Sequence, residues 1–420
     1  MLNCRAVKFA AILVSLAAVS AARPVRLDPV AARAEDFFGL TKLHNFHVTI
    51  APADFLRMSP AGEPGVYSEV PATLQFEDRN WGAISIRYKG NSSYKYAPGE
   101  IKRSLKLDLD SGTDRTFFGM SELNLNNNAF DPSQMREALA YDVFRRARVP
   151  APRTAFARVF LTVPGAHARK YLGLFTVVEQ VDQDFFESRW DRRVGLLVKP
   201  EGLTGMPYLG ADWARYERPY GSRTEPDSGD AARLVAFVKL LNHASDDEFA
   251  RRVGDYLDVD AFLRFLACEV VLVNTDSPLT TKRNYWMTVH PATRKIVWVP
   301  WDMNMAFAGF KPSDANLSVH APAAPGVFPL AERMLAIEAM VARYDLIVRE
   351  IVTTNFTVAR IERQISAIES VIGDAAAAEP TAIVSRAPPL RRFVVDRVRA
   401  VTAQLDGRRQ PHVRRRQHAD

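Results

Sequence analysis

The chain has 420 residues, of which 47 % are hydrophobic and 25 % are charged, and its formal net charge at pH 7 is +7. This length and apolar content are sufficient for a large two-lobed core or for two domains. No stretch combines basic residues with regularly spaced aromatic residues, so the positive charge alone does not support nucleic-acid binding.

The first 22 residues have the pattern of a secretory signal peptide. Arg5 and Lys8 make a basic start, residues 9–19 are apolar, and small residues follow up to Ala22. This pattern predicts cleavage after Ala21 or Ala22 and export to the periplasm, the cell envelope or the extracellular space. An uncleaved membrane anchor is the alternative, but the apolar run is short for a membrane span. We therefore expect no transmembrane span in the mature chain.

The two cysteines cannot form a disulfide within the exported chain. Cys4 would leave with the signal peptide, and Cys268 lies in an apolar, helix-like segment where a small buried core residue is expected. An exported protein without disulfides is compatible with a bacterial source.

A linker at residues 23–42 is followed by a strand-rich region that extends to about residue 180. Within this region D-P-S-Q-M-R-E predicts a helix over 132–148, with Asp131 as its N-cap and Pro132 at its first position. Alternating apolar residues and turn signals predict strands at 46–50, 72–76, 83–88, 102–109, 156–163 and 171–178. The last two of these strands are expected to pair as a hairpin.

The second half of the chain is dominated by helical patterns. They predict helices at 229–243, 246–253, 259–273, 326–351, 355–373 and 390–405. A strand-rich half followed by a helix-rich half predicts an α+β fold with two lobes, at residues 43–180 and 181–405. The basic segment 406–420 is expected to be a solvated tail, with binding to the envelope or to a polyanion as the alternative.

Two acids and an amide near residues 272–304 carry the main functional signal. Asp276 closes an apolar run, Asn284 begins a strand-like segment, and Asp302 follows the next apolar strand after a short turn. Two strands joined by a tight connection would bring Asn284 and Asp302 together, near Asp276. Phosphoryl transfer requires this set, because one acid orients the hydroxyl while an Asn and an Asp hold Mg²⁺ or Mn²⁺ at the phosphates. A turn Asp or a strand-start Asn without catalytic function is the alternative.

A kinase also needs a lysine for the phosphates and an acid that holds this lysine. Lys106 lies on the face of its strand opposite the leucines, so its ammonium can point into a cleft. Glu137, in the first turn of the predicted helix, is the candidate acid. The alternatives are a solvent-facing lysine and an acid that complements the helix dipole.

Further nucleotide contacts are predicted around these groups. Ser92 and Ser93, in the loop K-G-N-S-S, can cradle phosphate oxygens with their hydroxyl and backbone N–H groups, and Arg87 can add positive charge. Glu179, at the end of a strand, is expected at the hinge between the lobes, facing the base. Lys199 is expected to reach a phosphate from the second lobe. An ordinary hairpin loop remains the alternative for the serines.

The chain resembles the spore-coat protein H-like (CotH) kinase family, an atypical relative of the protein kinases. The resemblance is carried by I-R-Y-K-G-N-S-S (86–93), K-R-S-L-K-L (102–107), M-R-E-A-L-A-Y-D (135–142), Y-L-G-L-F-T-V-V-E-Q-V-D (171–182), L-V-K-P-E-G (197–202), N-T-D (274–276), R-N-Y-W (283–286) and V-P-W-D-M-N (299–304). The family pattern usually ends P-W-D-x-D, whereas this chain has Asn304 at the last position. The resemblance implies an atypical kinase-like fold, a nucleotide-binding first lobe and a catalytic second lobe.

These observations together predict an exported kinase that transfers the γ-phosphate of ATP to Ser or Thr hydroxyls of a protein. The alternative is an inactive, envelope-associated binding or structural protein that keeps the kinase-like fold, because ATP is scarce outside the cytoplasm. A weak indication of the acceptor is the segment 203–228. If exposed, its aromatic and acidic residues would suit a basic, Ser-containing peptide. The alternative is a surface loop that packs its aromatic residues against the second lobe. The aromatic and acidic residues of this segment are Tyr208, Trp213, Tyr216, Tyr220, Asp212, Glu217, Glu225 and Asp227.

Overall fold

The computed structural model describes residues 32–58, 67–95, 101–110, 115–310, 313–380 and 387–408. The predicted signal peptide therefore lies outside the described residues, as do residues 23–31 of the linker and residues 409–420 of the basic tail. In the part of the chain that is described, no helix is both long and apolar enough to cross a membrane.

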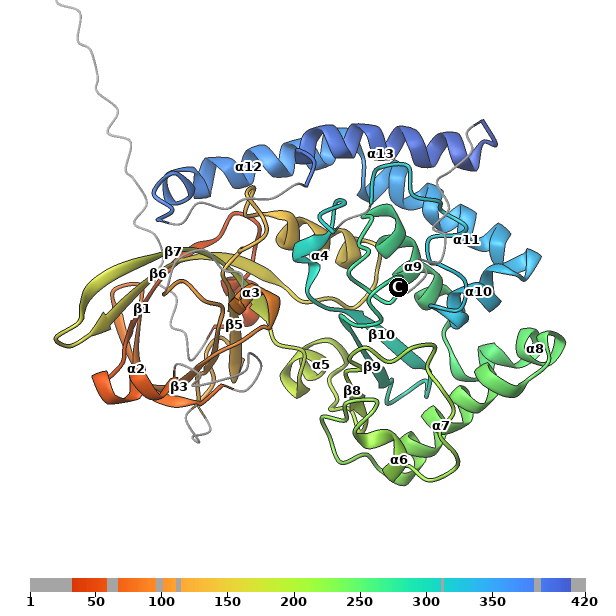
Figure 1. Cartoon of the computed structure of the whole chain (residues 1–420), viewed down its shortest axis with the longest axis horizontal. Helices are drawn as coiled ribbons and strands as arrows, with labels where there is room; N and C mark the ends of the chain where they lie inside the picture. Colours follow the sequence, from red (N-terminus) through yellow and green to blue (C-terminus); the bar gives the residue numbers. More distant parts are fainter. Residues whose placement is uncertain are drawn as a thin grey trace, which may run out of the picture.

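Seven strands of the first half close into a barrel, in the order β1-β2-β3-β4-β5-β7-β6 (Figure 1). Neighbouring strands are antiparallel except β1 and β6, which are parallel. The strands are β1 (Leu43–Thr49), β2 (Val70–Phe76), β3 (Arg79–Tyr88), β4 (Leu105–Asp108), β5 (Glu122–Asn126), β6 (Thr154–Val163) and β7 (His167–Glu179). Each predicted strand is found, but the closure of the barrel was not predicted.

The alternation of apolar and polar residues explains which face of each strand is buried. In β4, Leu105 and Leu107 are buried in the apolar cluster of the barrel, while Lys106 and Asp108 are half-buried on the other face. In β5 the residue types alternate, with Leu123 and Leu125 inside the barrel and Asn124 on its outer face, where Asn124 is covered by other parts of the chain. The outer face of β3, β4 and β5 is therefore polar, and it carries groups of the candidate site.

A second sheet and a group of helices form the rest of the molecule. The sheet has the order β10-β9-β8, and every residue of β9 and β10 is buried; its strands are β8 (Leu197–Val198), β9 (Tyr285–Val289) and β10 (Ile296–Pro300). The longer helices are α4 (Arg136–Arg146), α5 (Gln183–Trp190), α7 (Ser228–His243), α8 (Asp246–Tyr256), α9 (Val259–Val271), α11 (Glu338–Glu350), α12 (Val358–Ala377) and α13 (Leu390–Leu405). Shorter helical segments are α1 (Ala34–Phe37), α2 (Pro52–Met58), α3 (Ser92–Lys95), α6 (Ala214–Glu217), η1 (Met303–Met305), α10 (Pro329–Leu335) and the π-helical turn η2 (Ile351–Asn355).

The C-terminal helices connect the two parts of the fold. Figure 1 shows α12 and α13 along one edge of the molecule, with α12 next to β7 of the barrel. Two buried apolar clusters support this arrangement, one inside the barrel and one formed by the helices, the second sheet and the outer face of β6 and β7. The mixed α+β class is confirmed, whereas a division into two lobes stays a prediction.

Two predicted helices differ from the structure. The helix expected over 326–351 is divided into α10 and α11, because Ile337 between them has an extended backbone (φ −96°, ψ 114°). No Gly or Pro marks this break, and the apolar pattern continues through it. The helix expected over 132–148 begins at Arg136, with Met135 as N-cap. Asp131 instead stabilises the preceding turn, since its carboxylate accepts hydrogen bonds from the backbone N–H groups of Ser133 (2.9 Å) and Arg136 (2.8 Å).

Candidate functional site

A cavity of about 230 Å³ lies between the polar outer face of the barrel and the end of the second sheet. Groups of both charges line it. From the barrel side and α4 they are Lys89, Ser92, Ser93, Asn126 and Glu137, and from the other side Lys199, Glu201, Asp276, Arg283, Asn284, Trp301 and Asp302. The structure therefore brings the acid–amide set predicted from the sequence to one site.

Asp276 and Asn284 are joined by a direct hydrogen bond. The chain leaves α9 through Val273, which has a positive φ of 48°, and reaches Asp276 within three residues. The side-chain Nδ2 of Asn284 donates to the backbone oxygen of Asp276 (2.8 Å). This contact leaves the amide oxygen of Asn284 as its donor atom for a cation.

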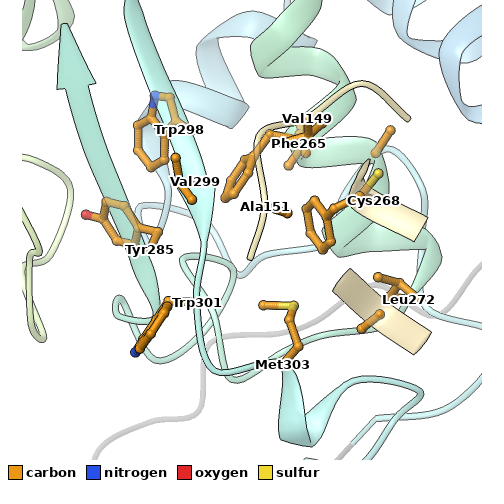
Figure 2. Packing of buried hydrophobic residues seen from close by; sticks show 14 of the residues in the cluster. Val149, Ala151, Phe265, Cys268, Leu272, Tyr285, Trp298, Val299, Trp301 and Met303 are labelled. Atoms are coloured by element: carbon orange, nitrogen blue, oxygen red, sulfur yellow. The ribbon is translucent and has the colours of Figure 1, made fainter. Parts of the chain in front are cut away.

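Asp302 follows β10 and is placed by its neighbours on both sides. Trp301 and Met303 are buried, and Figure 2 shows Met303 on the side of the helix that carries Cys268. The backbone N–H of Trp301 donates to Asn284 O (3.0 Å), which ties the two strand ends together. Burial of the Asp302 carboxyl and the negative charge of Asp276 raise its pKa to about 6, against the opposing effect of Lys89.

Lys89, directly after β3, lines this cavity from the barrel side. Its Nζ donates to Asn124 Oδ1 (2.9 Å) and to Asn126 Oδ1 (3.0 Å). Asn126 Nδ2 in turn donates to Glu137 Oε2 (2.8 Å), so an amide connects the lysine to the helix acid. Burial lowers the pKa of Lys89 to about 8, although the charges of Asp302 and Glu137 oppose this shift.

Glu137 is almost completely buried, with 2 % of its surface exposed. Burial and the charge of Asp302 raise the pKa of Glu137 to about 8, against the hydrogen bond from Asn126 and the charge of Lys89. Within the described residues its Oε1 atom has no hydrogen-bond partner. Glu137 lines the cavity, and the lysine connected to it there, through Asn126, is Lys89; a pairing of Glu137 with Lys106 stays a prediction.

Lys106 and Arg87 lie on the same outer face of the barrel as Lys89. Arg87 is two residues before Lys89 in the chain, and Lys106 is its neighbour on β4. Lys106 is paired in register with Arg87 on β3 and Asn124 on β5, and its Nζ is 2.7 Å from Glu122 Oε2. Arg87 Nη1 donates to the backbone oxygen of Tyr88 (3.2 Å). Neither side chain lines the cavity, so the structure places both beside the candidate site rather than in it.

Glu179 lies in an ion-pair network outside the cavity. Its carboxylate is 2.7 Å from Arg189 Nη2 and accepts a 3.1 Å hydrogen bond from Arg153 Nε. Burial acts to raise the pKa of Glu179, but the charges and hydrogen bonds of Arg189 and Arg153 outweigh it and lower the pKa. Both carboxylate oxygens of Glu179 thus contact arginines, and the expected contact with a nucleotide base stays a prediction.

The loop before α3 has a conformation that requires glycine. Gly90 has a φ of +85°, and a Cβ atom at this position would lie 2.2 Å from Ser93 Oγ. Ser92 and Ser93 both line the cavity, and their contact with phosphate oxygens stays a prediction. Lys199 lines it from the other side, where its Nζ is 2.7 Å from Glu201 Oε1 and 5.9 Å from the centre of the Trp301 ring.

The donor set of this cavity suits a small divalent cation with oxygen ligands. Asp302 and Asn284 offer a carboxylate and an amide oxygen, which Mg²⁺ and Mn²⁺ accept. The half-buried carboxyl of Asp302 is repelled by the negative charge of Asp276, and a bound cation would offset this repulsion. In the described part of the chain, no three His, Cys, Asp or Glu residues form a cluster that could hold a metal by themselves. Phosphate oxygens would have to complete the coordination.

Two of the aromatic residues in the segment 203–228 are packed in the interior rather than exposed to an acceptor. Tyr216 and Tyr220 are fully buried, and their hydroxyls donate to the backbone oxygens of Gly210 (2.8 Å) and Pro207 (2.9 Å). The alternative, a loop that packs its aromatics against the helical part, describes these residues. Glu217 and Glu225 are exposed.

The sequence interpretation missed Lys89, Asn124 and Asn126. A signal for the two asparagines was present in E-L-N-L-N (122–126), where they alternate with buried leucines on the polar face of a strand. Lys89 had no comparable signal, because its place in the cavity depends on side chains more than 30 residues away in the sequence.

Comparisons with known proteins agree with the resemblance noted in the sequence. Two relatives from Bacillus subtilis (strain 168) are the inner spore coat protein H-like protein, 25 % identical over 280 residues (66 % of this chain and 76 % of the relative), and the inner spore coat protein H, 24 % identical over 304 residues (71 % and 79 %). A chain from the Shewanella oneidensis MR-1 toxin–antitoxin complex of HipA, HipB and operator DNA is 14 % identical, with a TM-score of 0.29. This match covers 74 % of the present chain and 65 % of the other chain, less than two thirds of its length. The family described as CotH kinase protein matches residues 86–410, which is most of the sequence, and the chain therefore belongs to this family.

Proposed function

We propose that this protein is an exported kinase that transfers the γ-phosphate of ATP to Ser or Thr hydroxyls of a protein in the cell envelope or outside the cell. The observation that carries the proposal is the shared cavity, with Asp276, Asn284 and Asp302 on one side and Lys89 and Glu137 on the other. Membership of a kinase family supports the same reaction class.

The proposed roles follow from the chemistry of each group. Asp276 accepts the hydrogen bond of the incoming hydroxyl and orients it. Asn284 and Asp302 hold Mg²⁺ or Mn²⁺, and the ion would neutralise phosphate charge during transfer. Lys89 and the loop of Ser92 and Ser93 contact the phosphates, with Lys199 adding positive charge from the second sheet.

The proposed arrangement is that of a two-lobed kinase. The barrel part would bind the nucleotide, the helical part would supply the catalytic acid, and ATP would enter between them. The location outside the cytoplasm is supported by the signal-peptide pattern and by relatives that are named as spore coat proteins.

Labelled ATP tests the reaction directly. The purified protein is incubated with a Ser-containing basic protein, with Mg²⁺ or Mn²⁺ and with a metal-free control. We expect metal-dependent transfer that Asp276→Ala reduces by at least about 100-fold, while binding of MgATP changes little, because this acid acts on the hydroxyl. Asp302→Ala should instead weaken MgATP binding. Asp247→Asn, on the exposed face of α8, is the matched control.

Absence of metal-dependent transfer to any acceptor, and to the protein itself, would reject the enzyme. A second candidate would then apply, a kinase-like binding protein without catalysis. It is favoured by Asn304, which stands where the family pattern usually has a second acid. Binding of MgATP without transfer would identify this second function, and absence of both would reject the nucleotide site.

A further inference from the structure

Helix α4 contacts the turn after β10 at two points. The backbone N–H of Asp302 donates to the hydroxyl oxygen of Tyr141 (3.0 Å). Arg136, one helical turn earlier, donates through Nη1 to the backbone oxygens of Phe307 (3.0 Å) and Ala306 (3.3 Å). Tyr141 and Arg136 are buried, with 0 % and 2 % of their surface exposed. The helix therefore holds both ends of the segment from Asp302 to Phe307.

This segment has a backbone that needs such support. Asp302, Phe307 and Ala308 have φ values of 53°, 58° and 58°, although none of them is glycine. Residues with a Cβ atom adopt this left-handed region rarely, and they keep it where the surrounding structure imposes it. At Asp302 the partner of the backbone N–H is the Tyr141 hydroxyl.

We infer that Tyr141 is a positioning residue whose hydroxyl keeps Asp302 in the left-handed conformation and so directs its carboxylate into the cavity beside Asp276. The inference rests on the proposed function, because it assumes that Asp302 holds the metal ion. Tyr141 touches neither metal nor substrate in this role; it acts through the backbone of the ligand.

The position of Tyr141 on its helix suits this role. Tyr141 lies four residues after Glu137, on the same face of α4. One rigid helix thus carries both an acid of the cavity and the group that holds Asp302.

The test removes the hydroxyl and leaves the ring. Binding of Mn²⁺ in the presence of a non-hydrolysable ATP analogue is measured by electron paramagnetic resonance for the wild type, Tyr141→Phe and Tyr344→Phe. Tyr344, on α11, is the matched control. It is also fully buried, and its hydroxyl donates to the backbone oxygen of Val319 (3.0 Å). We expect Tyr141→Phe to bind Mn²⁺ roughly tenfold more weakly, and Tyr344→Phe to bind it like the wild type.

The outcomes separate this inference from the proposed function. A wild type that binds Mn²⁺, together with a Tyr141→Phe protein that binds it equally well, overturns the inference and leaves the proposed function standing. Equal weakening in both variants overturns it as well, because general loosening would then explain the loss. A wild type that does not bind Mn²⁺ with the analogue overturns the proposed metal site, and the inference with it.

A measurement on the wild type covers the case in which Tyr141→Phe does not fold. The hydrogen bond to Tyr141 requires slow hydrogen exchange of the Asp302 amide. Slow exchange at this residue supports the inference, and exchange as fast as that of an exposed loop amide overturns it.

Discussion

A buried lysine, Lys102, and a half-buried lysine at the cavity, Lys89, are held in different ways. Lys102 Nζ is 2.7 Å from Glu379 Oε2, in an ion pair whose side chains are 4 % and 7 % exposed. Lys89 Nζ is bonded to the neutral amide oxygens of Asn124 and Asn126, and Glu137 is reached through Asn126. The first lysine is neutralised directly by a carboxylate, whereas the second keeps a charge that a phosphate can use.

The surroundings of the two acids differ in the same way. Glu379 follows α12, and its Oε2 accepts a second hydrogen bond from the backbone N–H of Leu174 (3.0 Å). Gly173 makes this approach possible, since a Cβ atom at its φ of +127° would lie 2.6 Å from Glu379 Oε1. In both acids the Oε1 atom has no hydrogen-bond partner among the described residues, so the difference lies at Oε2. Glu379 Oε2 accepts directly from Lys102 Nζ (2.7 Å), whereas Glu137 Oε2 accepts from the amide of Asn126 (2.8 Å).

The largest effect is expected from breaking the direct pair. Glu379→Ala leaves the Lys102 ammonium buried without a partner, and should lower the free energy of unfolding by about 3–5 kcal/mol. Urea denaturation measures the change. In the matched double variant, Lys102→Met with Glu379→Leu, most of the stability should return because no charge is left buried. A loss below about 1 kcal/mol in Glu379→Ala would show that the pair contributes little to the fold.

Lys89→Met should have the opposite profile. Transfer should fall by roughly 100-fold, since the ammonium that stabilises charge on the phosphoryl group is lost. The free energy of unfolding should stay within about 1 kcal/mol of the wild type, because removing a charge from a half-buried position offsets the two lost hydrogen bonds. Initial rates with saturating metal and urea denaturation give the two values. A variant that keeps its rate would exclude Lys89 from phosphate binding.

The raised pKa of Glu137 predicts a dependence of stability on pH. Its pKa is about 8 in the folded protein and 4.5 in the ordinary state, so between these values the folded protein holds the extra proton. The stability that Glu137 contributes is therefore complete below about pH 4.5 and is lost as the pH rises through about 8. Urea midpoints from pH 5 to 9 should show the wild type losing stability relative to Glu137→Gln. Parallel curves would contradict the assigned shift.

The smallest effect is expected at Lys106, the lysine that the sequence favoured for the phosphates. Its partner Glu122 is 30 % exposed, and Lys106 itself 17 %, so the pair should contribute less than about 1 kcal/mol. Lys106→Met should leave the transfer rate within about twofold of the wild type, because the side chain does not line the cavity. A loss as large as that of Lys89→Met would restore Lys106 as the phosphate-binding lysine.

Short-range patterns accounted for much of the fold. The alternation in Leu105, Leu107 and Leu109 predicted a strand with one apolar face, and all three leucines are buried inside the barrel. The patterns behind α7, α9 and α13 were equally informative, since their bounds differ from the predicted ones by two residues or fewer. The helices that were misplaced, at 132–148 and 326–351, were changed by a turn around Asp131 and by an unmarked break at Ile337.

In the candidate site, too, groups on neighbouring segments were easier to predict than groups placed by distant contacts. Asp276, Asn284 and Asp302, which the sequence put forward together, line one cavity because they lie on consecutive segments and a tight connection between β9 and β10 brings the strand ends together. Lys106, the lysine put forward for the phosphates, does not line this cavity, because the outward face of β4 predicts a direction but not a partner. Lys106 meets Glu122, while Lys89 meets two asparagines of β5.

By itself, the sequence determined six of the seven barrel strands, most helices and the family, and it put forward the acid–amide set as a prediction, since each depends on residues close together in the chain or on motifs in order. The tertiary structure decided the closure of the barrel through pairing of β1 with β6, the placement of Lys89 and the ion pairs of Glu179. It also decided which aromatics of 203–228 are buried. These features depend on contacts between distant segments, and a local pattern carries no information on which distant side chain will arrive beside it.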